Sequence, residues 1–257
     1  MIRRMGQTLS VLLLGFTLGS APALKAVAAP PETAPPELTT VLEQIETAAN
    51  AQDLDELIEF YSPEFTNTDG FDREQLAEAL EQLWQQYPQL TYRLELQSWE
   101  QSGATLTAET ITYIEGTGIN YGRTLTLAAV VRSRQQLTRG QVVSQEILSE
   151  RNQLSSGDNP PDVTIMLPEQ AAVAAPFNFD AIVQEPLGDR LLLGAALDEG
   201  TTAEDFFLAR PLNLELLSAG GLFKIGTTPE QADDRWISAV LIREDGTTVI
   251  SQRLRVR

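Results

Sequence analysis

The sequence predicts an α+β domain, with three helices on one side of an antiparallel sheet, followed by an all-β second domain. Three observations support this prediction. Apolar residues recur at helical spacing between residues 38 and 87, and at a spacing of two from residue 92 onward, while no helical period is found beyond residue 162. Helices followed by a run of strands are typical of helices packed on one face of an antiparallel sheet.

Residues 1–28 have the order of a signal peptide. A basic start (Arg3-Arg4) precedes an apolar run at 11–18 (VLLLGFTL), and Ala26-Val27-Ala28 fits an A-x-A cleavage site. The apolar run is shorter than the ~20 residues that span a bilayer, so an uncleaved membrane anchor is the less favoured alternative. We therefore expect export, with cleavage after the third residue of that site.

Residues 29–37 are rich in proline and form the predicted spacer, in an extended or disordered conformation. Helical patterning starts directly after the spacer, at Leu38. A second helix follows Asp53 and a third follows Asp72, because both aspartates fit the N-cap position. The apolar faces of the three helices contain Leu38, Val41, Leu42, Ile45, Ala48, Ala49, Leu54, Leu57, Ile58, Tyr61, Leu76, Leu80, Leu83 and Tyr87.

The period then changes to two, which is typical of half-buried strands. Four strands are expected at residues 92–97, 104–115, 121–134 and 142–150. With the helices before them they complete a first domain of residues 38–154.

Residues 155–162 (SSGDNPPD) have the composition of a linker. In residues 163–257 short strands follow one another at 163–167, 177–184, 190–197, 212–217, 222–225, 236–243 and 247–255. Such a run of short strands favours a β-sandwich that folds without the first domain. We expect it to be immunoglobulin-like in architecture only, because the chain has no cysteine for the Cys…Trp…Cys signature.

The composition excludes several function classes. The chain has 36 acidic and 18 basic residues and a net charge of −18 at pH 7. We therefore expect no nucleic-acid partner, and no integral membrane segment once the signal peptide is cleaved. The absence of histidine and cysteine rules out Ser–His and Cys–His catalysis and ordinary zinc sites. We expect no metal site and no cofactor.

One local run carries a family resemblance. The segment 53–65 (DLDELIEFYSPEF) is followed by the turn 67–70 (NTDG) and then by the third helix. On this run and on the order of elements, residues 38–152 resemble the nuclear transport factor 2-like superfamily, which includes SnoaL-like polyketide cyclases and ketosteroid isomerases. The resemblance implies a cone, in which the helices close over a curved antiparallel sheet and leave a pocket. It implies no particular chemistry, because one fold hosts many functions.

No catalytic residue is assigned. Ketosteroid isomerases combine an aspartate base with a tyrosine and a second acid, and no position here matches those groups. Asp69 and Glu109 are the acids considered. Glu109 and Tyr113 share a strand face but stand ~13 Å apart, too far to serve one small reacting centre.

Arg123 is the main candidate for ligand binding. It has the strand parity of Leu125, Leu127, Ala129 and Val131, and an arginine on an apolar face needs a partner or an anionic ligand. The alternative is that Arg123 lies at the strand end and reaches water. The candidate ligand-binding residues are Arg123, Tyr121, Tyr113, Tyr92 and Tyr61.

The expected function is that of an exported, non-catalytic binding or accessory protein, whose first domain binds a small molecule or a protein. A cofactor-free pocket enzyme of isomerase, cyclase or dehydratase type is the first alternative, and a structural envelope subunit is the second. The expected location is periplasmic or extracellular, or the thylakoid lumen in a photosynthetic organism. The partner is unidentified, and a homodimer is an open alternative.

Overall fold

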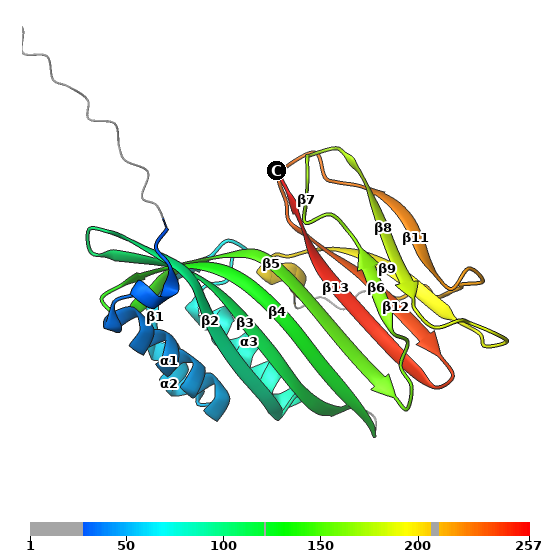
Figure 1. The fold of residues 1–257 in the computed structure, drawn as a ribbon, viewed down its shortest axis with the longest axis horizontal. Coiled ribbons are helices and arrows are strands. Elements are labelled where there is room, and N and C mark those ends of the chain that lie inside the picture. Colours follow the sequence, from blue (N-terminus) through cyan, green and yellow to red (C-terminus); the bar gives the residue numbers. More distant parts are fainter. Residues whose placement is uncertain (1–27, 121, 207–210) are drawn as a thin grey trace, which may run out of the picture.

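The protein is mostly antiparallel sheet with a few helices (Figure 1). The computed structural model describes residues 28–120, 122–206 and 211–257. The helices are α1 (Pro36–Ala51), α2 (Leu54–Glu59), α3 (Arg73–Gln86) and the short α4 (Ala203–Phe206), with a 3-10 turn at Pro31–Thr33. The strands are β1 (Tyr61–Asn67), β2 (Gln89–Ser102), β3 (Thr105–Asn120), β4 (Arg123–Thr138), β5 (Gln141–Gly157), β6 (Val163–Met166), β7 (Gln170–Ala171), β8 (Pro176–Val183), β9 (Leu193–Gly200), β10 (Glu215–Leu216), β11 (Gly221–Thr227), β12 (Arg235–Arg243) and β13 (Gly246–Val256).

The three predicted helices are confirmed together with their caps. Asp53 accepts a hydrogen bond from the backbone N–H of Glu56 at the start of α2. Asp72 and Gln75 form the predicted capping box at the start of α3. The helices cover one face of β2–β5, and their apolar stripes share a core with that sheet face (Figure 1). This arrangement confirms the predicted helices on one side of an antiparallel sheet.

A strand that the sequence did not predict follows α2. The predicted second helix included Tyr61, but α2 ends at Glu59, and residues 61–67 form β1, which runs parallel to β5. Pro63 cannot continue a helix, and the alternation that buries Tyr61 and Phe65 suits a strand. The rings of these two residues meet edge to face, with centroids 5.0 Å apart.

The predicted linker is also wrong in its first part. Residues 155–157 are the end of β5, which pairs with β4 on one side and with β13 on the other. One large sheet, ordered β10-β9-β12-β13-β5-β4-β3-β2, therefore runs through both halves of the chain. Ser155, Ser156 and Gly157 resemble a linker in composition, but their backbone hydrogen bonds are made by two neighbouring strands.

The second sheet is small and belongs to residues 158–257, which we call the C-terminal part. Strands β11, β8 and β6 form it in that order, and its apolar side chains share a core with β12 and β13 of the large sheet. The predicted sandwich is therefore not a unit of two separate sheets, because the layer that packs on the small sheet, β12 and β13, is part of the large sheet. The immunoglobulin-like architecture stays a prediction.

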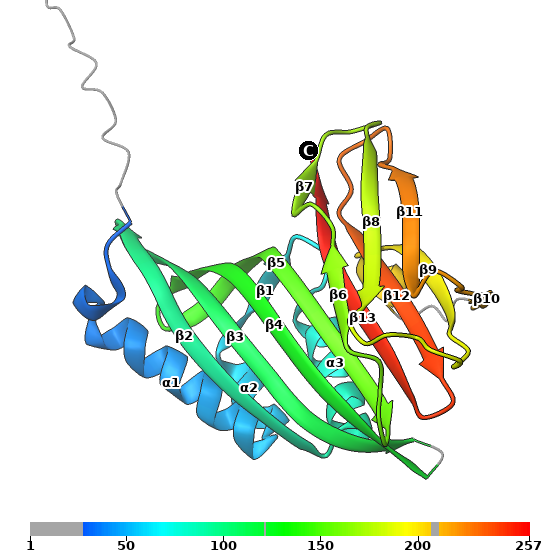
Figure 2. The same ribbon diagram turned by 45° about the vertical axis from the view of Figure 1, so that its right-hand side comes forward.

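Strands β5 and β13 pair over only part of their length. The ladder joins Gly246–Gln252 to residues 151–157 of β5, and the strands then separate toward the end where Arg253 and Arg255 lie (Figure 2). Arg255 still reaches Glu146 of β5, at 2.6 Å. Charged side chains thus bridge the two strands where their backbones no longer meet.

The proline-rich spacer is ordered, and its backbone is extended, as predicted, at Pro30, Ala34 and Pro35 on either side of the 3-10 turn. Ala29 exchanges two backbone hydrogen bonds with Trp99 of the edge strand β2, with N···O distances of 2.7 and 3.1 Å. The Trp99 indole N–H also donates to the hydroxyl of Thr33. The spacer is held because it closes part of an open strand edge. The predicted signal peptide lies outside the described residues, except for Ala28. None of the helices in the described ranges has the length and apolar character needed to cross a membrane.

Candidate functional site

A cavity of about 180 Å³ lies between the helices and the large sheet. We call it the helix–sheet cavity. Its walls come from α1, α2, α3 and from strands β1–β5. Apolar side chains make up most of the lining, together with two tyrosines and a few uncharged polar groups. The lining residues are Ile45, Glu46, Ala49, Leu57, Tyr61, Leu76, Leu80, Tyr92, Leu94, Thr112, Ile114, Val131, Ser133, Gln135 and Gln145.

Two of the predicted ligand-binding residues, Tyr61 and Tyr92, meet in this cavity. Burial raises the pKa of Tyr61 to about 12. Burial also raises the pKa of Tyr92, against a smaller lowering effect of the hydrogen bond that Trp84 Nε1 donates to its hydroxyl at 2.8 Å. Both phenols are therefore neutral at physiological pH, and neither is a ready base.

Gln135 carries a polar atom for which the fold provides no partner. Its residue surface is 4% exposed, and its side-chain oxygen Oε1 is buried without a hydrogen-bond partner. The neighbouring Ser133 hydroxyl is already paired with that of Thr110, at 3.2 Å. A buried acceptor without a partner is costly, so this oxygen is suited to a donor on a ligand. Its position on β4, with the parity of Val131, is a signal that the sequence analysis missed.

Glu46 is the acid among the lining residues, and the fold already uses it. Its Oε2 accepts a hydrogen bond from the backbone N–H of Leu94 at 2.6 Å. Helix α1 thereby holds the outer edge of β2 with this carboxylate. The lining thus offers apolar contacts and hydrogen-bonding groups to a ligand.

The structure places Tyr113 and Glu109 on the opposite face of the sheet, away from the helices. Tyr113 alternates with Thr112 and Ile114, which line the cavity, and the guanidinium of Arg93 lies 3.9 Å from the centre of its ring. Glu109 binds Arg132 and Arg134, at 2.8 and 2.6 Å. These two candidates therefore belong to the surface and do not reach the helix–sheet cavity.

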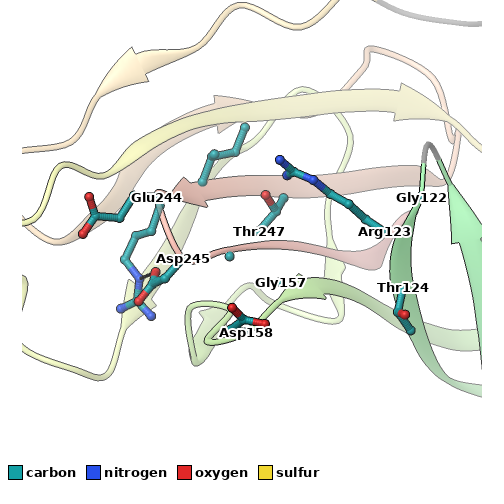
Figure 3. A pocket seen from close by; sticks show the side chains of 11 residues that line it. Gly122, Arg123, Thr124, Gly157, Asp158, Glu244, Asp245 and Thr247 are labelled. Atoms are coloured by element: carbon teal, nitrogen blue, oxygen red, sulfur yellow. Dashed lines mark hydrogen bonds and ion pairs between the residues drawn. The ribbon is translucent and has the colours of Figure 1, made fainter.

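Arg123 lines a different cavity, of about 450 Å³, at the ends of the β3–β4 and β12–β13 hairpins (Figure 3). Its side chain extends toward Thr247, while Glu244 lies at the far side of the view. The residue is exposed at the first position of β4, and among the described residues no hydrogen bond or ion pair involves its guanidinium. Its role as an anion-binding residue stays a prediction. Tyr121 lies outside the described residues.

A buried ionic cluster joins the two halves of the chain, and no pattern in the sequence predicts it. The guanidinium of Arg253 is 1% exposed and contacts Asp69 at 2.5 Å, Asp234 at 3.3 Å and Glu150 at 3.4 Å. Burial raises the pKa of Glu150 to about 7; Arg253 opposes the shift, and the charge of Asp69 adds to it. Asp69, which the sequence offered as a candidate base, is thus occupied by an arginine 184 residues away.

Among residues 28–120, 122–206 and 211–257, no group of three or more acidic side chains is arranged to hold a metal ion. The expectation that the protein binds no cofactor stays a prediction.

Comparison with known families matches only the C-terminal part. Residues 158–257 match a family described as a domain of unknown function (DUF8623). The match starts directly after the last residue of β5 and covers less than half of the chain. No curated protein matches the sequence.

Solved structures with similar folds are remote. Bd1075 of Bdellovibrio bacteriovorus is 16% identical over 43% of this chain, with a TM-score of 0.31, and this chain spans 38% of its length. A protein from Shewanella putrefaciens CN-32, described as a SnoaL-like polyketide cyclase, is 17% identical over 44% of this chain and 89% of its own, with a TM-score of 0.34. A protein of ketosteroid isomerase-like fold from Catenulispora acidiphila is 12% identical over 42% of this chain and 82% of its own, with a TM-score of 0.31. Likenesses at this level do not carry a function to this chain.

Proposed function

We propose that this protein is an exported, non-catalytic ligand-binding protein, whose helix–sheet cavity takes a small apolar molecule with one hydrogen-bond donor. The observation that carries the proposal is the buried, unpartnered Oε1 of Gln135, a residue that lines a cavity with mostly apolar walls. An apolar cavity of about 150 Å³ accommodates benzene, so the 180 Å³ here suits a single ring with a hydroxyl group.

The state of the other polar groups supports binding over catalysis. The Tyr61 and Tyr92 phenols hold their protons at physiological pH, and Glu46 is engaged by the backbone of β2. A general base must reach the proton it removes and must have a pKa near the working pH. The Tyr61 and Tyr92 phenols, with their raised pKa values, do not meet the second condition.

Phenol and toluene form a matched pair of probes for this proposal. Both fit one ring into the cavity, and only phenol can donate to Gln135. We expect phenol to bind more tightly than toluene to the full chain, and the variant Gln135→Met to lose about tenfold in phenol affinity while keeping its toluene affinity. This ratio corresponds to one net hydrogen bond of about 1–1.5 kcal/mol. Ligand-observed NMR titration of both probes measures it.

Arg123→Ala is the control, because Arg123 lines the hairpin cavity and not the helix–sheet cavity. It should leave both affinities unchanged. Equal losses of phenol and toluene in Gln135→Met would contradict the role of Gln135. Turnover of a ring-containing substrate that depends on Glu46 would favour the pocket-enzyme alternative.

The export half of the proposal rests on the order of residues 1–28. We expect the mature chain to begin at or next to Ala29, the residue that pairs with Trp99. N-terminal sequencing of the protein recovered from the cell envelope measures this. Recovery of chains that still begin at Met1 from that fraction would contradict cleavage, and protein confined to the cytoplasm would contradict export.

A further inference from the structure

Residues of the C-terminal part bind the turn between β1 and α3 (residues 67–70) through hydrogen bonds and an ion pair. The two terminal guanidinium nitrogens of Arg253, Nη2 and Nη1, donate to the Asp69 carboxylate at 2.5 and 2.9 Å. Thr201 donates its hydroxyl to Asp69 Oδ1 at 3.1 Å, and the backbone N–H of Ala203 donates to the Asp69 carbonyl at 2.9 Å. Charge-assisted bidentate pairs of this kind fix geometry as well as energy.

The same turn holds two walls of the helix–sheet cavity. Asn67 Nδ2 donates to the side-chain oxygen of Gln145 at 3.0 Å, and the Thr68 N–H donates to the Gln145 carbonyl at 3.0 Å. Gln145 lines the cavity. The turn also leads directly into α3, whose Leu76 and Leu80 line the cavity from the helix side.

The surroundings of Arg253 stabilise its contact with Asp69. The Arg253 side chain is 1% exposed, and Asp234 supplies further negative charge beside it, at 3.3 Å. The side chain therefore stays ionised inside the fold, with Asp69 as its bidentate partner. A buried charge that loses a partner is expensive, so the turn cannot leave Arg253 without a penalty.

We propose that the C-terminal part sets the ligand affinity of the helix–sheet cavity, with Arg253 as a positioning residue that acts through Asp69 on Gln145 and α3. The affinity half of this inference rests on the proposed function, whereas the positioning half does not. The C-terminal part is then a control element for the cavity rather than an independent binding unit.

Asp69→Asn is the sharpest variant, because Asp234 still compensates Arg253 when the Asp69 charge is removed. The matched control is Asp245→Asn, which takes a carboxylate from another buried arginine of the C-terminal part, Arg243, without contact to the turn. Both variants lose one carboxylate beside an arginine that is 1% exposed.

Amide hydrogen exchange of the ligand-free full chain tests the positioning half. We expect Asp69→Asn to speed exchange about tenfold in residues 67–70 and in the first turn of α3, with the amides of β3 and β4 unchanged. Asp245→Asn should leave all of these rates unchanged. Unchanged exchange at the turn and α3 in Asp69→Asn, or an equal rise over the whole chain, would overturn the inference.

Phenol titration of the same variants tests the affinity half. We expect Asp69→Asn to weaken phenol binding about five- to tenfold, and Asp245→Asn to leave it unchanged. In the unmutated chain, saturating phenol should slow amide exchange around Arg253, because coupling between two sites is reciprocal. Because this measurement uses the unmutated chain, it tests the coupling even if Asp69→Asn does not fold. Unchanged exchange around Arg253 in the phenol-saturated chain would overturn the coupling. A wild-type chain that does not bind phenol would contradict the proposed function, while the ligand-free exchange would still decide the positioning half.

Discussion

At the scale of single residues, Glu150 makes the stability of this protein depend on pH. Burial raises its pKa from 4.5 to about 7, in spite of Arg253 beside it. Between these two values the folded chain keeps a proton that the unfolded chain releases. The contribution of Glu150 to the free energy of unfolding therefore falls as pH rises through this window, by at most ~1.4 kcal/mol per pH unit.

We expect this fall in chemical denaturation experiments between pH 4.5 and 7, and a clearly smaller slope in Glu150→Gln, which cannot release a proton. Glu109 does not contribute to the change in the free energy of unfolding between pH 4.5 and 7. Burial would raise its pKa, but hydrogen bonds from Arg134 and Arg132 outweigh burial and lower it. The stability that Glu109 contributes is therefore lost only at more acid pH. A slope that is the same in Glu150→Gln and in the unmutated chain would show that another group is responsible.

At the scale of elements, helix α1 protects the open edge of β2. Asn50 Oδ1 accepts from the Tyr92 N–H and its Nδ2 donates to the Tyr92 carbonyl, both at 2.8 Å. Two residues further along the same edge, the Glu46 carboxylate accepts a hydrogen bond from the backbone N–H of Leu94. These side chains take the place of a neighbouring strand, and they remove an edge on which other chains could pair.

We expect Asn50→Ala to lower the free energy of unfolding by about 1–2 kcal/mol, because two backbone groups of Tyr92 lose their partner. Urea denaturation measures the change. Gln44→Ala, on an exposed position of the same helix, should stay within about 0.5 kcal/mol of the unmutated chain. Equal effects of the two substitutions would mean that the contact with β2 contributes nothing.

At the scale of the whole molecule, the two halves have separate apolar cores but one continuous sheet. The core of the C-terminal part consists of residues between 163 and 256. Its strand β13 nevertheless pairs with β5 of the other half over Gly246–Gln252. The expectation of an independently folding second domain must therefore be restated, since isolation exposes a strand edge.

We expect the fragment 158–257 to unfold cooperatively, because its core is complete, but at a lower temperature than the full chain. We also expect it to self-associate through the open edge of β13. Thermal unfolding and size-exclusion chromatography measure the two effects. A fragment without a cooperative transition would show that its core depends on β5, and a monomer as stable as the full chain would show that the β5–β13 pairing contributes little.

Local patterns in the sequence determined much of the fold. The helices and most strands were predicted within a few residues, because apolar periodicity and capping residues such as Asp53 and Asp72 act over short distances. Strand parity also placed Tyr92 on the apolar face of its strand, which lines the helix–sheet cavity. The candidate site was predicted only in part, since Gln135 has the same parity as Val131 but no local feature distinguishes a buried unpartnered amide from a satisfied one.

Only the tertiary structure decided how distant segments meet. Three contacts join residues that lie far apart along the chain. Strand β1 pairs in parallel with β5, strand β5 pairs with β13, and Arg253 contacts Asp69. Such contacts leave no period in the sequence, because each is selected by the packing of whole elements and not by its neighbours. The same packing moved Tyr113 and Glu109 to the outer face, and it turned Asp69 from a candidate base into the partner of an arginine.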